Sequence, residues 1–198
     1  MTNMIYALVG PHAAGKATLV TQLISMGIPF IPTYTTYEFP QHGRTRQKTK
    51  SAQLYRTVSR EEFSQLDLVV QFTHKGDFYG IRKDDILNAL KEHAISVMIL
   101  ESSGIKQLNK LIKKKLSTIY LMADYVTLID RMLRMGYTND EIKYHLQYAE
   151  NNKEFDSWKL TTHVIKNTHD PQLSLAQLLS IMGLSTVVPQ EQFNKMIQ

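Results

Sequence analysis

The segment VGPHAAGKATLV, residues 9–20, contains the most specific motif of the chain. Gly10, Gly15 and Lys16 stand at the spacing of a phosphate-binding P-loop, G-x-x-x-x-G-K-[ST], between a strand-sized apolar run and a helical pattern. In such a loop, backbone N–H groups at the start of the helix face phosphate oxygens, and the lysine adds a mobile positive charge. An ordinary glycine turn before a helix is the simpler alternative. Because strand, loop, lysine and helix are in one register, the pattern favours nucleotide binding.

The residue after the lysine departs from the motif. It is Ala17, which has no hydroxyl for a magnesium ion, and the hydroxyl comes one place later, at Thr18. One residue turns a side chain about 100° around a helix, so Thr18 is an imperfect substitute, and water could fill the metal position. Thr18 is therefore the only loop side chain that we expect to be able to contribute to a Mg²⁺ site. The predicted ATP phosphate-binding residues are Gly10, His12, Ala13, Ala14, Gly15, Lys16, Ala17 and Thr18.

Length and composition exclude several classes of protein. A chain of 198 residues is most simply one domain, and it is long enough to bury a substantial core. It has no cysteine, which excludes disulfides and thiolate metal sites, and its histidines show no metal-ligand spacing. The N-terminus has no basic stretch leading into an apolar run, and no run reaches the roughly 18 apolar residues of a membrane span. We expect a cytoplasmic protein without a membrane partner.

The charge balance indicates the kind of partner. A formal net charge of +5 suits an anionic ligand, which could be a nucleotide or a nucleic acid. Nucleic-acid binding rests on charge alone, whereas the phosphate-binding loop points to nucleotides specifically.

Strand-like and helix-like segments alternate along the chain, as in a parallel sheet with crossover helices. Near-continuous apolar character at 95–101 and 116–122 is typical of buried parallel strands. Between 33 and 80, Tyr, Thr, Arg and Gln replace this rhythm and predict an inserted β-rich lobe, within which SREE (59–62) is a capping box that predicts a short helix. The predicted strands of the α/β core are 4–9, 95–101, 116–122 and 162–167, and the predicted helices are 16–26, 83–92, 103–113, 124–135, 139–155 and 171–182.

Several segments together resemble the guanylate kinases. GPHAAGKATL (10–19) is similar to the opening of that family, G-P-S-G-A-G-K-S-T-L. Five later segments resemble, in order, its T-T-R, D-Y-x-F-V-S-x-x-E-F, G-N-Y-Y-G, I-D-x-Q-G and R-L-x-x-R-G elements. They are TTY (35–37), LYRTVSREEF (54–63), GDFYG (76–80), ILESSG (99–104) and RMLRMG (131–136). Because the segments follow in family order over residues 4–167, the chain is identified as a divergent member of the guanylate kinase family.

The resemblance implies both an architecture and a reaction. The fold would be a P-loop NTPase-type parallel sheet with flanking helices, an inserted β-rich monophosphate-binding lobe and a helical lid. The reaction would transfer the terminal phosphoryl group of ATP to GMP or a related nucleoside monophosphate, with ATP and Mg²⁺ as cofactors. The implied divisions of one domain, 1–198, are a core at 1–32, 81–123 and 156–184, the lobe at 33–80, the lid at 124–155 and a tail at 185–198.

Family roles carry over to particular residues of this chain. Lys16 would cradle the donor phosphates and Arg131 would neutralise charge on the transferring group, while Arg134 lies beside the place of a second lid arginine. Tyr55 and Tyr79 would hold the phosphate of the acceptor. Glu101 would read the edge of the guanine, with a hydroxyl from Thr33 near the same base. The implied acceptor-binding residues are Thr33, Tyr37, Arg44, Tyr55, Gln71, Tyr79 and Glu101.

The chain departs from the family at several functional positions. Tyr37 and Met135 replace arginines, and Ile99 replaces an acid. The guanine-reading glutamate falls at Val69 or Val70, which leaves the neighbouring Gln71 as an uncharged hydrogen-bonding group. Arg44 or Arg46 would reach the acceptor phosphate in place of a missing arginine. Two function classes stay open: a nucleoside monophosphate kinase with altered acceptor specificity or low activity, and a catalytically silent nucleotide- or protein-binding module. The intact Lys16 and Arg131 favour the kinase.

Overall fold

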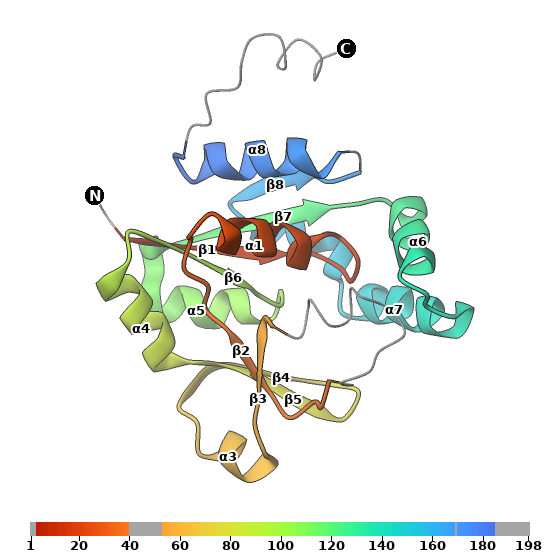
Figure 1. Cartoon of the computed structure of the whole chain (residues 1–198). Coiled ribbons are helices and arrows are strands. Elements are labelled where there is room, and N and C mark those ends of the chain that lie inside the picture. Colours follow the sequence, from red (N-terminus) through yellow and green to blue (C-terminus); the bar gives the residue numbers. More distant parts are fainter. Residues whose placement is uncertain (1–2, 40–52, 169, 185–198) are drawn as a thin grey trace, which may run out of the picture.

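A computed structural model describes residues 3–39, 53–168 and 170–184. In this part of the chain, helices cover a parallel sheet, and a second sheet lies to one side of it (Figure 1). The elements in chain order are β1 (Met4–Val9), α1 (Lys16–Ser25), β2 (Thr33–Thr35), β3 (Tyr55–Thr57), α3 (Arg60–Ser64), β4 (Leu68–His74), β5 (Asp77–Arg82), α4 (Lys83–Glu92), β6 (Ile95–Ile99), α5 (Gly104–Ile112), the 3₁₀ turn η1 (Lys113–Lys115), β7 (Leu116–Met122), α6 (Tyr125–Arg134), α7 (Asn139–Asn151), the 3₁₀ segment η2 (Glu154–Leu160), β8 (His163–Lys166) and α8 (Pro171–Ile181).

The first sheet has the strand order β6-β1-β7-β8, and every pairing in it is parallel. Alternate side chains of β1 enter two hydrophobic clusters on opposite faces of this sheet. Tyr6 and Leu8 pack with α1, α6 and α8, whereas Ile5, Ala7 and Val9 pack with α4 and α5. Figure 1 shows α1 and α8 on one side of the sheet and α5 on the other. Burial on both faces explains why the core strands read as continuous apolar runs.

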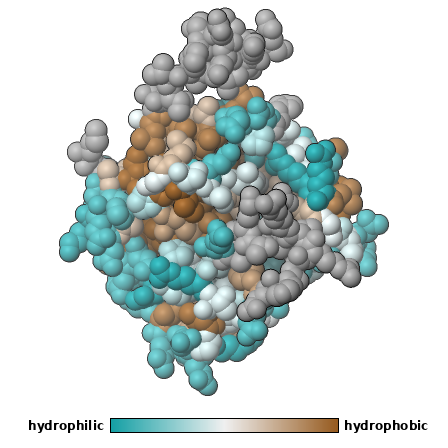
Figure 2. Space-filling model, in the orientation of Figure 1, coloured by the Kyte–Doolittle hydropathy of each residue, from teal (hydrophilic) through white to brown (hydrophobic). Residues whose placement is uncertain are grey.

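The outer surface over α1 and α8 is more apolar than its surroundings. In the orientation of Figure 1, hydrophobic residues gather there, while the lower left edge of the molecule is hydrophilic (Figure 2). Within the described residues, no helix has both the length and the apolar character needed to cross a membrane.

The second sheet has the order β3-β2-β5-β4. Strands β2 and β3 are parallel, and β5 runs antiparallel to both β2 and β4. Lys75 and Gly76 join β4 to β5 with φ angles of 52° and 85°, the positive values that a tight hairpin turn requires. The hairpin carries His74, the last residue of β4, and Tyr79 of β5, whose rings lie 6.4 Å apart.

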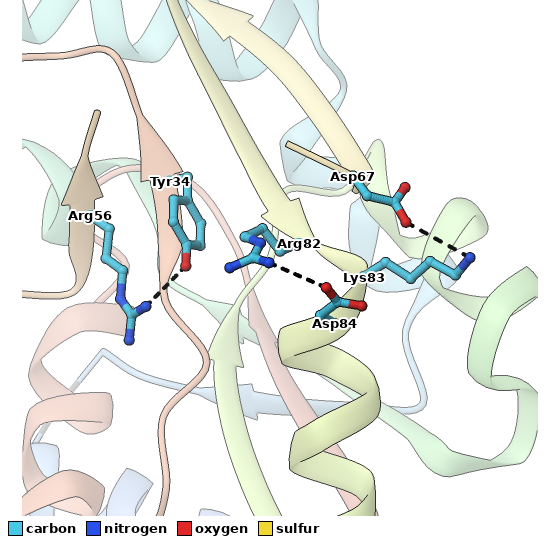
Figure 3. Close-up of polar contacts among 6 residues, drawn as sticks. All are labelled: Tyr34, Arg56, Asp67, Arg82, Lys83 and Asp84. Carbon is cyan, nitrogen blue, oxygen red and sulfur yellow. Dashed lines mark hydrogen bonds and ion pairs between the residues drawn. The ribbon is translucent and has the colours of Figure 1, made fainter. Parts of the chain in front are cut away.

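Polar contacts fix the strands of the second sheet to each other and to α4 (Figure 3). Arg56 of β3 donates to the hydroxyl of Tyr34 in β2 at 2.9 Å. Where β5 continues into α4, Arg82 forms an ion pair with Asp84 at 3.2 Å, and its guanidinium lies over the ring of Tyr34, 5.8 Å from the centroid. Each exposed pair contributes about 1 kcal/mol or less, so these contacts orient the strands more than they stabilise them.

The predicted α/β architecture is confirmed, and most element limits agree within two residues. The capping box is also confirmed, because the Ser59 side chain accepts from the Glu62 N–H at the start of α3. The predicted helix 139–155 is wrong at its end. Helix α7 stops at Asn151, because Lys153 takes the left-handed conformation (φ 54°) and a 3₁₀ segment follows. The internal boundaries of the lobe and lid stay predictions, and the tail, 185–198, lies outside the described residues.

Candidate functional site

The loop between β1 and α1 has the backbone geometry of a phosphate cradle. Gly10 and Gly15 have φ angles of 145° and 103°, which side-chain-bearing residues rarely adopt. A Cβ at Gly10 would lie 2.8 Å from the carbonyl oxygen of Leu121, so only glycine fits against β7 there. Ala13 is also left-handed, with φ 63°, which stores about 1 kcal/mol of strain. Strain of this kind is concentrated at functional sites.

The N-terminus of α1 opens onto this loop. Gly15 is its N-cap, and no side chain in the described part of the chain caps the first N–H groups of the helix. These groups therefore keep their capacity to bind an anion. The Lys16 ammonium donates to the carbonyl oxygens of Gly10 and Pro11, the second at 2.9 Å, and so lies over the loop itself.

Arg131 of α6 reaches the same loop from the outside. One guanidinium nitrogen donates to the carbonyl oxygens of Ala13 and Ala14 at 3.2 and 3.3 Å, and the other donates to the Asn167 carbonyl at 2.8 Å. Burial lowers the pKa of Arg131, and Asp124 and Asp130 oppose this shift, so the group stays charged. Arg131, the predicted lid arginine, therefore lies beside the loop.

Asn167, directly after β8, completes this contact. Its side-chain amide donates to the Ala14 carbonyl at 2.7 Å and accepts from the Ser174 hydroxyl at 2.9 Å. A Cβ on Gly15 would overlap the amide nitrogen of Asn167, so the second loop glycine is needed for this close approach. The end of the last core strand thus holds the outer side of the loop.

Arg134 is not brought to the loop. It is exposed and forms an ion pair with Asp130 along α6 at 2.9 Å, one turn away. Of the two predicted lid arginines, the structure places only Arg131 beside the P-loop.

Two carboxyl groups lie on the other side of the loop. Glu101 follows β6, Glu154 begins η2, and they lie together with Gly10 and Ser157. Burial, together with the charge and hydrogen bond of Glu101, raises the pKa of Glu154 to about 7, while Lys16 acts in the opposite direction. Near neutral pH, Glu154 is therefore protonated part of the time, and its protonated carboxyl group donates a hydrogen bond to Glu101. Glu101, a predicted acceptor-binding residue, lies close to the loop and beside the buried carboxyl group of Glu154.

The predicted acceptor tyrosines form a pair. The rings of Tyr55 and Tyr79 meet edge to face with centroids 6.2 Å apart. Burial raises the pKa of both hydroxyls, with Glu101 adding to the effect at each, while a hydrogen bond with Thr35 opposes it at Tyr79. Both groups are therefore neutral and able to donate to phosphate oxygens. Thr33 is buried in β2.

The remaining acceptor residues are less well placed. Tyr37 is exposed, its N–H donates to the Thr35 hydroxyl at 3.0 Å, and its ring offers no charge to a phosphate. Val70 is buried against Gly104, where a Cβ would lie 2.7 Å from its Cγ1, and Gln71 is exposed on β4. Arg44 and Arg46 lie outside the described residues.

The loop side chains supply few oxygen ligands for Mg²⁺. Ala17 has none, and Thr18 is exposed on the first turn of α1. Across the described residues, no group of three His, Cys, Asp or Glu side chains could hold a metal ion. The donor set fits a magnesium ion held mainly by nucleotide phosphates and water, because Mg²⁺ keeps several waters in most protein sites.

Sequence reasoning missed Asn167, Glu154 and His74. Asn167 carried a usable signal, because a polar residue at the carboxyl end of a parallel strand lies where ligands bind in α/β sheets. Glu154 fell near the end of the predicted helix 139–155, and nothing local marks it as buried. His74 lies in a hairpin whose contact with α7 no short motif encodes.

The parallel sheet, the P-loop and the β-rich lobe beside it define an α/β P-loop kinase fold. No protein-family model matches the chain. It is 25% identical over 156 residues to the guanylate kinase of Nostoc sp. strain PCC 7120, covering 76% of each chain. It is 23% identical over 186 residues to the guanylate kinase of Wolbachia pipientis wMel, covering 91% of this chain and 90% of the relative.

Among solved structures, the guanylate kinase from Anaplasma phagocytophilum matches with a TM-score of 0.66 at 16% identity, over 92% of this chain and 85% of that one. At this identity the match supports the fold. Together with the two sequence relatives, it shows that the chain is a distant homologue of the guanylate kinase family.

Proposed function

We propose that this protein is a nucleoside monophosphate kinase, which transfers the terminal phosphoryl group of ATP to GMP or a related monophosphate. The observation that carries the proposal is the convergence of Lys16 and Arg131 on the carbonyl groups of one P-loop. A module that binds only protein has no need of these two cations at a phosphate cradle.

Phosphoryl transfer depends on alignment and positive charge more than on covalent chemistry of the protein. The N–H groups of the loop and of α1 would bind the donor phosphates, whose oxygens would replace the carbonyl acceptors of Lys16. Arg131 would face the transferring group, and Tyr55 and Tyr79 would donate to the acceptor phosphate. Mg²⁺, bound with ATP as is typical of guanylate kinases, neutralises charge on the donor phosphates.

A silent nucleotide-binding module is the second candidate. Arg131 is engaged by three main-chain carbonyls and Arg134 by Asp130, and Tyr37 brings no charge to the acceptor side. If neither arginine leaves these partners, ATP would bind without transfer.

The test is a coupled assay of ADP release from Mg·ATP with GMP, AMP, CMP, UMP and dTMP as acceptors. We expect turnover with at least one acceptor, its loss in Lys16→Ala, and its retention in Lys166→Ala, which removes an exposed lysine on β8. Mg·ATP binding without any transfer would establish the silent module instead. Absence of nucleotide binding in the wild type would overturn both candidates.

A further inference from the structure

Three histidines from separate parts of the chain meet beside the P-loop. His12 belongs to the loop, His74 ends β4, and His145 lies in α7. The rings of His12 and His145 stack with centroids 4.1 Å apart and planes 14° apart, and the ring of His74 lies 6.3 Å from that of His145. The Tyr137 hydroxyl lies 3.1 Å from Nε2 of His12. We call His12, His74 and His145 the histidine cluster.

The cluster lies between the two groups of residues that the proposed reaction must connect. At one end, His12 is close enough to Lys16 for the lysine charge to act on its ring. At the other end, the ring of His74 lies 6.4 Å from that of Tyr79, which in turn contacts Tyr55. Ring contacts therefore run from the donor loop to the acceptor tyrosines, through the imidazoles.

The electrostatic surroundings disfavour the charged forms of His12 and His74 while no anion is present. Burial lowers the pKa of His12 well below its usual value, and His145, Lys16, His74 and Lys75 lower it further. Burial and Lys75 lower the pKa of His74, with Glu101 and Asp77 opposing.

Other titratable groups also face the cluster. They are the hydroxyls of Tyr137, Tyr144 and Tyr148, with Glu141 acting on Tyr137. A polyphosphate brings several negative charges among these groups, and an opposite charge within about 4–6 Å raises a histidine pKa by about 1–3 units.

We propose that the histidine cluster binds the phosphates between the donor and acceptor sites and takes up a proton from the solvent as they bind. The N–H⁺ groups formed in this way would supply positive charge to a chain in which Tyr37 and Met135 stand in place of arginines. This inference rests on the proposed function, because it concerns the same phosphate site. It adds the prediction that the histidines gain their positive charge when the phosphates bind.

The probe is P1-(5′-adenosyl) P5-(5′-guanosyl) pentaphosphate, which spans both sites, titrated with Mg²⁺ by calorimetry. Runs at pH 6.0 in buffers of different ionisation enthalpy measure the number of protons exchanged on binding. We expect the wild type to take up about 0.5–1 proton more than the double variant His12→Ser/His145→Gln. The affinity of the wild type should fall by up to about tenfold per pH unit as the pH rises above the raised pKa, since the bound form is protonated.

Two further variants separate this inference from folding defects and from the proposed function. His145→Arg supplies a permanent charge, so binding should remain tight while the proton uptake and the pH dependence shrink. His163→Gln, an exposed histidine on β8, should behave as the wild type. Equal proton uptake in the wild type and the double variant, with binding still lost in Lys16→Ala, would overturn the histidine inference alone. A wild type that does not bind the probe would overturn the proposed function as well.

Discussion

The side-chain amide of Asn167 donates to the Ala14 carbonyl at 2.7 Å, although 153 positions separate the two residues. This bond fixes the outer edge of the P-loop to the end of β8. The Arg131 guanidinium donates to the main chain of both residues. The loop is therefore held by α6 and by the residue that follows β8, and its shape depends on the last core strand.

Asn167→Ala should destabilise the protein and weaken nucleotide binding together. The change leaves the Ser174 hydroxyl and part of the bonding capacity of the Ala14 carbonyl unsatisfied in a buried site, which costs about 1–3 kcal/mol. Urea unfolding measures the loss. Asn152→Ala removes a similar amide-to-carbonyl bond, at 2.8 Å to Tyr148, from an exposed site. Equal effects of the two changes would show that the Asn167 contact has no special weight.

Arg131→Lys should reduce turnover strongly, whereas Arg134→Lys should change it little. Arg131 uses two guanidinium nitrogens on three carbonyls, a geometry that an ammonium cannot reproduce. Loss of a transition-state arginine costs about 10³-fold or more in rate. Arg134, by contrast, is exposed and pairs with Asp130 on its own helix. Steady-state kinetics of both variants decide between them, and a larger loss at Arg134 would place the transferring group on the outer side of α6.

The P-loop could be predicted from sequence because its signal is local: glycines, a lysine and the change from strand to helix pattern lie within a few residues. The pairing of Asn167 with Ala14, and of His12 with His145, depends on how distant segments cross the sheet, which no local period encodes. The end of α7 likewise has no local signal in the sequence. The left-handed Lys153 that ends this region is a lysine rather than a glycine, so the sequence carries no stop signal there.

Glu154→Gln should stabilise the protein above neutral pH. Burial beside Glu101 raises the pKa of Glu154 from 4.5 to about 7, so its charged form is disfavoured in the folded state. The contribution of Glu154 is therefore fully favourable below about pH 4.5 and is lost as the pH rises through 7. We expect the variant to gain about 1–3 kcal/mol relative to the wild type between pH 5 and pH 8.

Urea unfolding of both proteins across this range, with a chelator present, provides the measurement. Glu61→Gln, at an exposed position of α3, reports the effect of removing a surface carboxylate. A difference between wild type and Glu154→Gln that does not change with pH would contradict the assigned environment of Glu154.

Preference for GMP over AMP should be weak. Val70 is buried against Gly104 and Gln71 is exposed, so neither replaces a charged reader of guanine, and Glu101 shares its surroundings with Glu154. We expect the ratio of kcat/KM values for the two acceptors to lie well below about 10⁴, the scale of a site that satisfies every hydrogen bond of the base. A ratio near that value would mean that another residue reads guanine and that the alignment of 69–71 is wrong.

Restoring a hydroxyl after the loop lysine should strengthen the use of magnesium. Ala17→Ser would place an oxygen on the first turn of α1, where P-loop proteins hold Mg²⁺, and the small side chain suits the helix. We expect Mg·ATP to bind about 3–10-fold more tightly, in line with one added interaction of about 1 kcal/mol, and ATP in chelator to bind as before. Turnover should rise with it if Arg131 completes the transfer site. Thr18→Ala provides the matched comparison, because its exposed hydroxyl is the alternative ligand on the same turn. Calorimetry with and without Mg²⁺ decides the matter: equal affinity of wild type and Ala17→Ser for Mg·ATP, with a loss in Thr18→Ala, would assign the metal contact to Thr18 instead.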